Sequence, residues 1–250
     1  MKRRKFVAAS LASTVMAGSL SASPLMAPKE TTNEIYELKS YEMSQGGDKN
    51  ALKKYLKEVL KPALTKCGAN HFLTFSEYGS PAPTKFWLLV SFPDFQSYHK
   101  SILELASPEF SKKAKEYTEA GKIYNRISSS LLYAFDGLKQ MVKPMDGPSL
   151  FELRIYEGSN EDAVKRKIKM FNNEELGLFQ KLGMGPVFFG DMLVGPYVPS
   201  LVYMLNYKDM EHRDDVWGQF GKHPDWAKMK VKKEYANTVS NIRRIFLEPM

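Results

Sequence analysis

The chain has 250 residues, which is enough for one large domain or two ordinary ones. Hydrophobic residues make up 43% and charged residues 26% of the chain, which excludes wholesale disorder and collagen-like or coiled-coil architectures. The formal net charge is +8, but four positive charges lie at positions 2–5, and residues 1–27 contain no acidic residue. Without that segment, 32 basic and 28 acidic residues leave only +4, so the charge gives no support for nucleic acid as a partner.

Residues 1–27 have the features of an export signal. Basic residues at positions 2–5 precede an apolar run from Phe6 to Leu20 and then small residues suited to cleavage. The run is shorter than the roughly 20 residues that span a bilayer. The pair Arg3-Arg4 predicts the twin-arginine route, with an ordinary secretory signal as the alternative. We expect an exported, periplasmic or otherwise extracytoplasmic protein whose cleavage site stays open.

The cysteine count bears on lipid attachment and on disulfide bonding. Cys67 is the single cysteine, so the sequence offers neither a lipid-attachment motif at the leader nor an internal disulfide. No later stretch is apolar and long enough to cross a membrane. The sequence therefore predicts no stable membrane anchor once the signal is removed.

The rest of the chain is a tandem repeat. The segment YELKSYE at 36–42 matches FELRIYE at 151–157, and 86–94 matches 201–209 at the same offset. We therefore predict two copies, at 33–138 and 148–250, joined by the Pro- and Gly-containing linker 139–147.

Within each copy, alternating and helical hydrophobic patterns follow one another in the same order. In the first copy we predict a strand at 35–42, a helix over 52–64 ended by Gly68, two strands flanking the turn 79–83, a helical region from Asp94 that restarts at Pro108, and a strand at 128–135. In the second copy we predict a strand at 151–157, a helix from Val164 ended by Gly183, strands at 186–194 and 199–207, helices from near Asp209 and Pro224, and a strand at 240–248.

This order predicts an α+β fold made of two tandem ferredoxin-like βαββαβ repeats. Such a unit forms a four-stranded antiparallel sheet with both helices on one face, so its other face needs a cover. The second copy is the obvious cover. We expect the two sheets to pack face to face as an α+β barrel of the dimeric type, built by one chain.

Two sets of residues carry a resemblance to a known family. The paired segments YELKSYE and FELRIYE resemble the opening strands of NIPSNAP domains, and the segment 217–226 is similar to that family's tryptophan–phenylalanine–proline–tryptophan stretch. The resemblance implies the dimeric α+β-barrel fold, whose other users include cofactor-free monooxygenases and haem-handling enzymes. It is strongest in the second copy, because Phe110 replaces the second tryptophan in the first copy. A functional site is therefore expected to be asymmetric.

Alternation along the first strand of each copy separates an apolar face from a charged one. We expect the apolar set to meet the helices and the charged set to face the partner sheet inside the barrel. One hypothesis is a polar cavity that binds a small aromatic or oxygen-rich molecule; the alternative is a pair of structural ion pairs. The candidate ligand-binding residues are Glu37, Lys39, Tyr41, Glu152, Arg154 and Tyr156, joined by Trp217, His223 and Trp226 from the resembling segment.

Metal and nucleotide sites have little support. His212 and Asp215 could share a helix face, but two residues do not define a metal site, so none is predicted. Gly183-Met184-Gly185 follows a helix and precedes a strand, which is the reverse of a dinucleotide fingerprint. No cofactor is predicted, but haem is not excluded, because the resemblance implies a fold that haem-handling enzymes also use.

Two function classes therefore remain. The first is a binding or interaction module with a small-molecule ligand, and the second is an oxidoreductase of the α+β-barrel monooxygenase or haem-handling type. Whether the protein is an enzyme, and whether it forms a homo-oligomer, is left open by the sequence.

Overall fold

The computed structural model describes residues 32–79, 81–118, 123–144, 147 and 150–250, and these belong to one structural unit. The predicted export signal at 1–27 lies outside the described residues. None of the described helices is long and apolar enough to span a bilayer.

The first copy follows the predicted order of elements. Its first helix is continuous through a π-helical segment, η1, and its second helical region breaks before Pro108, as predicted. The elements are β1 (Ile35–Glu42), α1 (Lys49–Lys54), η1 (Tyr55–Leu60), α2 (Lys61–Lys66), β2 (His71–Glu77), β3 (Lys85–Phe92), α3 (Phe95–Leu105), α4 (Pro108–Thr118) and β4 (Arg126–Ala134).

The second copy repeats this order, including the π-helical segment, and adds a short 3₁₀ turn before its last strand. The elements are β5 (Leu150–Glu157), α5 (Glu161–Met170), η2 (Phe171–Glu175), α6 (Leu176–Lys181), β6 (Gly185–Val194), β7 (Ser200–Tyr207), α7 (Met210–Lys222), α8 (Pro224–Met229), η3 (Lys233–Tyr235) and β8 (Asn241–Pro249).

Local signals explain where several helices begin and end. The side chains of Asp94 and Asp209 accept hydrogen bonds from the backbone N–H groups of Ser97 and His212, which caps α3 and α7. Gly68 and Gly183 follow α2 and α6 with φ of +97° and +66°, a conformation that glycine adopts without steric cost.

The eight strands form a closed antiparallel barrel in the order β1-β3-β2-β8-β5-β7-β6-β4. The two sheets therefore face each other across the interior, as predicted, and are also hydrogen-bonded to each other along both edges. One seam joins β4 to β6, and the other joins β2 to β8 over only three residue pairs, Phe75–Glu77 with Leu247–Pro249. Each copy thus completes the sheet of the other.

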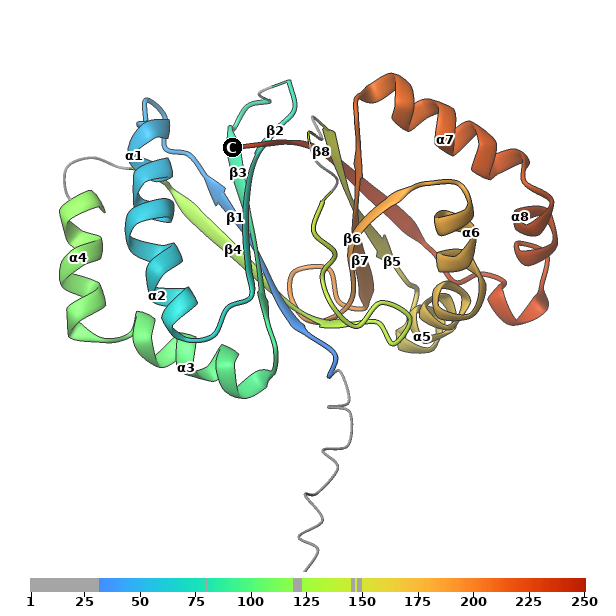
Figure 1. The fold of residues 1–250 in the computed structure, drawn as a ribbon, viewed down its shortest axis with the longest axis horizontal. Helices are drawn as coiled ribbons and strands as arrows, with labels where there is room; N and C mark the ends of the chain where they lie inside the picture. Colours follow the sequence, from blue (N-terminus) through green and yellow to red (C-terminus); the bar gives the residue numbers. More distant parts are fainter. Residues whose placement is uncertain (1–31, 80, 119–122, 145–146, 148–149) are drawn as a thin grey trace, which may run out of the picture. The chain divides into compact units, whose positions relative to one another are not determined.

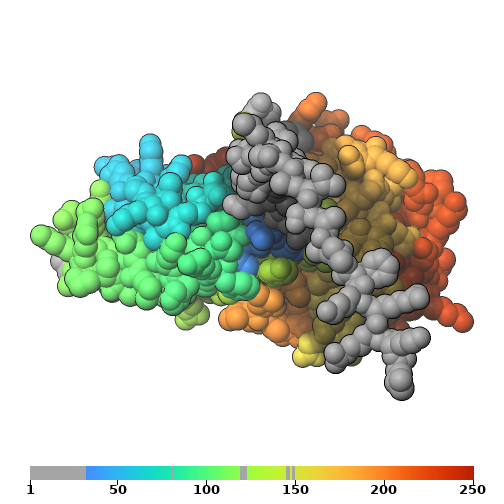
Figure 2. Space-filling model, turned by 60° about the horizontal axis from the view of Figure 1, so that its bottom comes forward, coloured from blue at the N-terminus to red at the C-terminus, as the bar shows by residue number. Residues whose placement is uncertain are grey.

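The helices cover the barrel from two sides. Those of the first copy pack on one side and those of the second copy on the opposite side (Figure 1). The space-filling view shows the same two helical flanks, with strand atoms visible between them (Figure 2). Three hydrophobic clusters result: one under each set of helices and one inside the barrel.

The inside of the barrel is lined by the face that the sequence analysis assigned to the helices. Tyr36, Leu38, Leu153 and Ile155 belong to the interior cluster, whereas Tyr156 packs under the helices of its own copy. The predicted alternation is present, but the predicted direction is wrong. In a closed barrel with helices outside, both faces of each strand are buried, so hydrophobicity alone does not distinguish inside from outside.

The β4–β6 seam gives the first testable prediction. A Cβ atom on Gly190 would lie 2.8 Å from Cβ of Leu132, and neither atom is at the flexible end of a side chain. We expect Gly190→Ala to lower the free energy of unfolding by about 1–3 kcal/mol, because the seam must shift to accept the methyl group.

Gly177→Ala is the matched control, because a Cβ there meets nothing within 4 Å and the residue lies in α6. That variant should gain up to about 1 kcal/mol from helix propensity. Urea unfolding measures both variants, and equal stability of the two would contradict the close approach at the seam.

Candidate functional site: a cavity at the barrel mouth

Side chains that point into the barrel change character along each strand. On β1 the interior-facing series runs from Tyr36 and Leu38 to Ser40 and Glu42. On β4 the order is reversed along the chain, from polar Arg126 to apolar Ala134, because the strands are antiparallel. The apolar ends meet at one end of the barrel, where Glu34 and Ser91 are also buried and hydrogen-bonded to each other. The polar ends meet at the other end, where the barrel opens.

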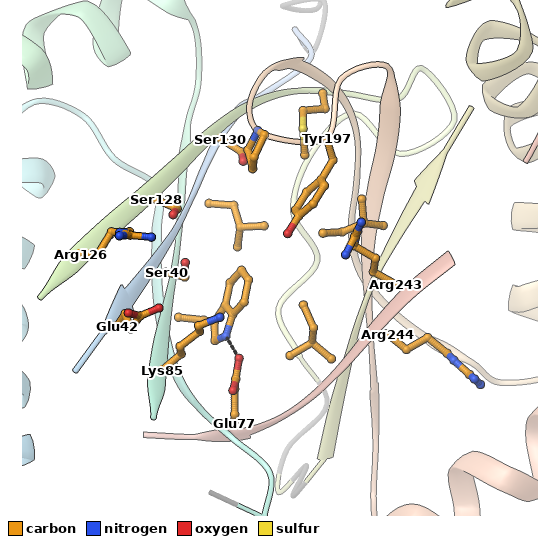
Figure 3. Close-up of a pocket in the computed structure, with 16 residues that line it drawn as sticks. Ser40, Glu42, Glu77, Lys85, Arg126, Ser128, Ser130, Tyr197, Arg243 and Arg244 are labelled. Carbon is orange, nitrogen blue, oxygen red and sulfur yellow. Dashed lines mark hydrogen bonds between the residues drawn. The ribbon is translucent and has the colours of Figure 1, made fainter. Parts of the chain in front are cut away.

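A cavity of about 480 Å³ occupies this open end, which we call the barrel mouth. Its size lies within the range of about 300–1,000 Å³ that is usual for small-molecule sites. Both copies contribute to its walls (Figure 3). The lining residues are Leu38, Ser40, Glu42, Glu77, Lys85, Trp87, Arg126, Ser128, Ser130, Ile155, Met192, Pro196, Tyr197, Arg243, Arg244 and Ile245.

The first-copy wall carries the available positive charge. Lys85 and Arg126 flank Glu42 on the two strands that pair with β1, and all three lie on one side of the mouth (Figure 3). Within the described part of the chain, neither Lys85 nor Arg126 makes an ion pair or a side-chain hydrogen bond. Ser40 and Ser128, which pair with each other one step deeper in the barrel, add hydroxyl groups. An anionic ligand would therefore find cations that no protein carboxylate has already engaged.

Aromatic side chains form the apolar part of the cavity. The indole of Trp87 donates a hydrogen bond to Glu77 at 2.9 Å, which fixes the ring. From the second copy, Tyr197 points into the cavity beside Arg243 (Figure 3), whose guanidinium lies 4.3 Å from the centre of the tyrosine ring.

Arg243 is itself committed, because it forms a short ion pair with Glu157. Arg244 lines the cavity but points its guanidinium away from it (Figure 3). Arg243 thus positions Tyr197, and anion binding is left to the first-copy wall.

The sequence-predicted residues of the second copy come together elsewhere, between the sheet and its helices. Glu152 is fully buried and accepts two hydrogen bonds from Arg213, both at 2.9 Å, and one from the indole of Trp217 at 3.1 Å. Arg154 completes this cluster with an ion pair to Glu152 at 3.7 Å. One carboxylate therefore balances two guanidinium groups, one of which, Arg213, also pairs with Asp214.

Arg154 is held mainly by aromatic rings. Its guanidinium lies 4.1 Å from the ring centre of Trp217 and 5.5 Å from that of Tyr156, while Nε and Nη1 have no hydrogen-bond partner. Burial alone would lower the pKa of Arg154, but Tyr203, Tyr156 and Glu152 outweigh it and raise the pKa. The arginine stays charged inside a cage of π faces.

The remaining second-copy candidates border this cluster. Tyr156 accepts a hydrogen bond from Tyr203 at 2.9 Å, and burial raises the pKa of both phenols. Trp226 packs on Phe220, which in turn packs on Trp217. His223 accepts a hydrogen bond from the backbone N–H of Asp225 and caps α8, which is the structural use of this histidine.

The first-copy candidates lie under the opposite set of helices and do not meet their counterparts. Glu37 pairs with Lys39 at 3.0 Å and accepts a hydrogen bond from Ser129. Tyr41 packs edge-to-face on Tyr124. The expected gathering of both charged sets around one axis inside the barrel is therefore wrong, because each set faces outward toward its own helices. Glu37–Lys39 and Glu152–Arg154 do form ion pairs, but they face the helices and not the partner sheet, so they do not set how the sheets dock.

A further buried ion pair was not predicted from the sequence. Lys167 donates a hydrogen bond to Glu175 at 2.6 Å, and both side chains are more than nine-tenths buried. The corresponding first-copy positions, 115 residues earlier, are Leu52 and Leu60, both buried. This polar-for-apolar exchange between aligned repeats is a signal that a direct comparison of the two copies would have found.

The residues of the barrel mouth were also missed, although the sequence carries a trace of them. Most of the strand residues among them share the face of Leu38 and Leu153, and the polar ones lie at one end of their strands. The signal appears only after the interior face has been assigned correctly.

The site chemistry gives no indication of a metal. Among the residues that the structure describes, no group of three or more His, Cys, Asp or Glu side chains could hold an ion. The described residues that line the mouth include no histidine and no cysteine. The cavity therefore does not offer the imidazole or thiolate that most haem sites use as an axial ligand.

Comparisons of the fold agree with this architecture. A candidate monooxygenase from Fusobacterium nucleatum is similar over 87% of this chain and 93% of its own, with a TM-score of 0.58 and 12% identity. A candidate monooxygenase from Lactobacillus acidophilus is similar over 87% and 94%, with a TM-score of 0.58 and 13% identity. The chain thus has the fold of the dimeric α+β-barrel class.

The second copy carries the family signal. Residues 151–250 match the model of the NIPSNAP family, so this copy is a NIPSNAP-like domain. A NIPSNAP-like domain protein from Burkholderia xenovorans aligns with 42% of this chain and 87% of its own, at 19% identity and a TM-score of 0.38. No curated protein matches the chain.

The two copies allow a controlled test of the Glu152 cluster. Glu152→Gln leaves the buried Arg154 without a carboxylate and leaves Arg213 with Asp214 alone, so we expect a loss of about 3–5 kcal/mol in the free energy of unfolding. The control is Glu37→Gln, at the equivalent position, which leaves a single flexible ammonium group. In the same urea titration, Glu37→Gln should lower the free energy of unfolding clearly less than Glu152→Gln does. Equal losses in the two variants would contradict the shared-carboxylate arrangement.

A second test concerns the Lys167–Glu175 pair. The double substitution Lys167→Leu/Glu175→Leu installs the residues of the first copy and should leave stability unchanged or raise it by about 1–4 kcal/mol. Lys167→Leu alone should cost about 3–5 kcal/mol, because Glu175 then remains buried and unpaired. Thermal and urea unfolding measure the stability of the single and the double variant. A double variant as unstable as the single one would show that the pair is needed for more than mutual neutralisation.

Proposed function

We propose that this protein binds a small organic anion, best represented by an aromatic carboxylate, in the barrel mouth. The observation that carries the proposal is the pairing of two uncommitted cations, Lys85 and Arg126, with the aromatic surface of Trp87 in one cavity. The carboxylate of the ligand would contact the two cations from the cavity side, because Glu42 lies between them on β1, and its ring would rest against the indole. The apolar residues deeper in the barrel exclude water behind it.

Several features support a binding role. The cavity is walled by both copies, so its shape depends on the closed barrel rather than on one loop. Glu77 fixes the Trp87 ring and the Glu157–Arg243 pair fixes Tyr197, which reduces the ordering that a ligand would have to impose. A preorganised, mixed cationic and aromatic cavity is suited to a flat anion.

Calorimetric titration with 1-naphthoate tests the proposal. We expect saturable binding at one site, and Lys85→Gln/Arg126→Gln should weaken it by about tenfold or more, since each substitution removes a charge-assisted contact. Lys112→Gln/Lys113→Gln on α4 is the control, because it makes the same charge change on an exposed helix outside the mouth.

The uncharged analogue 1-naphthalenemethanol separates charge from shape. The unmodified protein should bind this alcohol more weakly than it binds 1-naphthoate. The affinity for the alcohol should be the same in the Lys85→Gln/Arg126→Gln variant. Unchanged 1-naphthoate affinity in a folded Lys85→Gln/Arg126→Gln variant would refute binding at the barrel mouth.

The oxidoreductase alternative rests on fold similarity to the two candidate monooxygenases. A binding protein returns its ligand unchanged, whereas an oxygenase consumes oxygen and adds mass to the aromatic ring. Mass spectrometry of 1-naphthoate recovered after aerobic incubation distinguishes the two. We expect recovery of the unmodified acid.

A further inference from the structure

We propose that a second site, in a pocket beside the β2–β8 seam, binds a free single-chain anionic amphiphile such as a fatty carboxylate. We call it the lateral pocket. It is lined by Lys53, Lys54, Leu56, Lys57, Glu58, Lys61, Phe72, Leu73, Thr74, Phe75, Phe151, Pro249 and Met250, and its volume is about 730 Å³. It shares no lining residue with the barrel mouth.

The pocket exists because the barrel wall is thin at this point. β8 pairs with β2 over Phe75–Glu77, and one backbone hydrogen bond from Met250 to Thr74 extends the seam. The first three residues of β2, 71–73, are paired with β3 on one side alone. The helix that begins at Lys49 runs past this part of β2 and forms the outer wall of the pocket. A lateral entrance is thus left between the helix and the incomplete seam.

The floor of the pocket is apolar. Phe75 and Phe151 are buried and pack edge-to-face with ring centres 4.8 Å apart, and both belong to the cluster inside the barrel. Leu56, which belongs to the helix itself, is buried on its inner side. Phe72 and Leu73 are half-buried and so present carbon surface to the pocket. A hydrocarbon chain lying on this floor would cover that surface.

The rim is cationic and unbalanced. Lys53, Lys54, Lys57 and Lys61 are exposed along one continuous helix, and none of them makes an ion pair with a described residue. Glu58 is the only acidic residue in the lining, and it already accepts a hydrogen bond from Tyr117 at 2.8 Å. The charged side chains of the lining, four ammonium groups and one carboxylate, sum to +3 above an apolar floor.

Comparison of the copies shows that the fold does not require this rim. The positions 115 residues later are Ile168, Lys169, Asn172 and Leu176, which supply one cation instead of four. The lysines are therefore not a consequence of building this helix on this sheet. Their charge complements an acidic head group, and the floor complements its chain, which favours an anionic amphiphile over a simple inorganic anion.

Calorimetric titration with monomeric dodecanoate tests the proposal on the whole chain. We expect one site whose affinity rises by about fourfold for each added methylene between octanoate and dodecanoate. The variant Lys53→Gln/Lys57→Gln/Lys61→Gln should weaken dodecanoate binding by about tenfold at low salt. The control Lys112→Gln/Lys113→Gln/Lys115→Gln, on α4, makes the same charge change and should leave the affinity unchanged.

Two further measurements locate the ligand. The variant Lys85→Gln/Arg126→Gln should bind dodecanoate with unchanged affinity. If this variant instead loses dodecanoate binding while the lysine triple variant keeps it, dodecanoate lies in the barrel mouth and the lateral site is overturned. Co-sedimentation with phosphatidylglycerol vesicles that depends on the three lysines, without binding of monomeric dodecanoate, would instead identify a membrane surface and also overturn it. Because naphthoate binding is scored separately, failure of either site is distinguishable from failure of the other.

Discussion

The structure depends on one constraint: neither copy can bury its own four-stranded sheet. Each copy covers one sheet face with helices and leaves the other face apolar and both outer edges unpaired. Joining the edges through β2–β8 and β4–β6 pairs the backbone groups and encloses the interior side chains at the same time. The barrel interior, the mouth and the lateral pocket all follow from how completely these two seams close.

The two sides of each sheet serve different purposes as a result. Inside the barrel, side chains grade from an apolar end to an open polar end, which creates a cavity walled by both copies. Outside, the layer between sheet and helices is buried, and the charges placed there must neutralise one another. Glu152 with two arginines, and Lys167 with Glu175, meet that demand in the second copy. The first copy uses Leu52 and Leu60 at the latter positions, so its helix–sheet layer is less polar.

Much of the fold could be predicted from the sequence because its signals are local or repeated. The offset of 115 residues revealed the two copies, and Asp94, Asp209, Gly68 and Gly183 marked helix ends that the structure confirms. The direction of the strand faces was wrong, because two buried faces look alike in a hydrophobicity pattern. Lys85 and Arg126 are far apart in the chain and come together only because their strands both pair with β1. No local sequence motif therefore predicts the residues of the barrel mouth.

The central claim is that the cavity enclosed by the joined sheets is where a ligand binds, rather than the polar layer beneath the second-copy helices. A crystal structure of the protein grown with 1-naphthoate tests this most directly. We expect the carboxylate in contact with Lys85 and Arg126 and the ring system against Trp87. Naphthoate found instead against Arg154 and Trp217, beneath the helices, would contradict it.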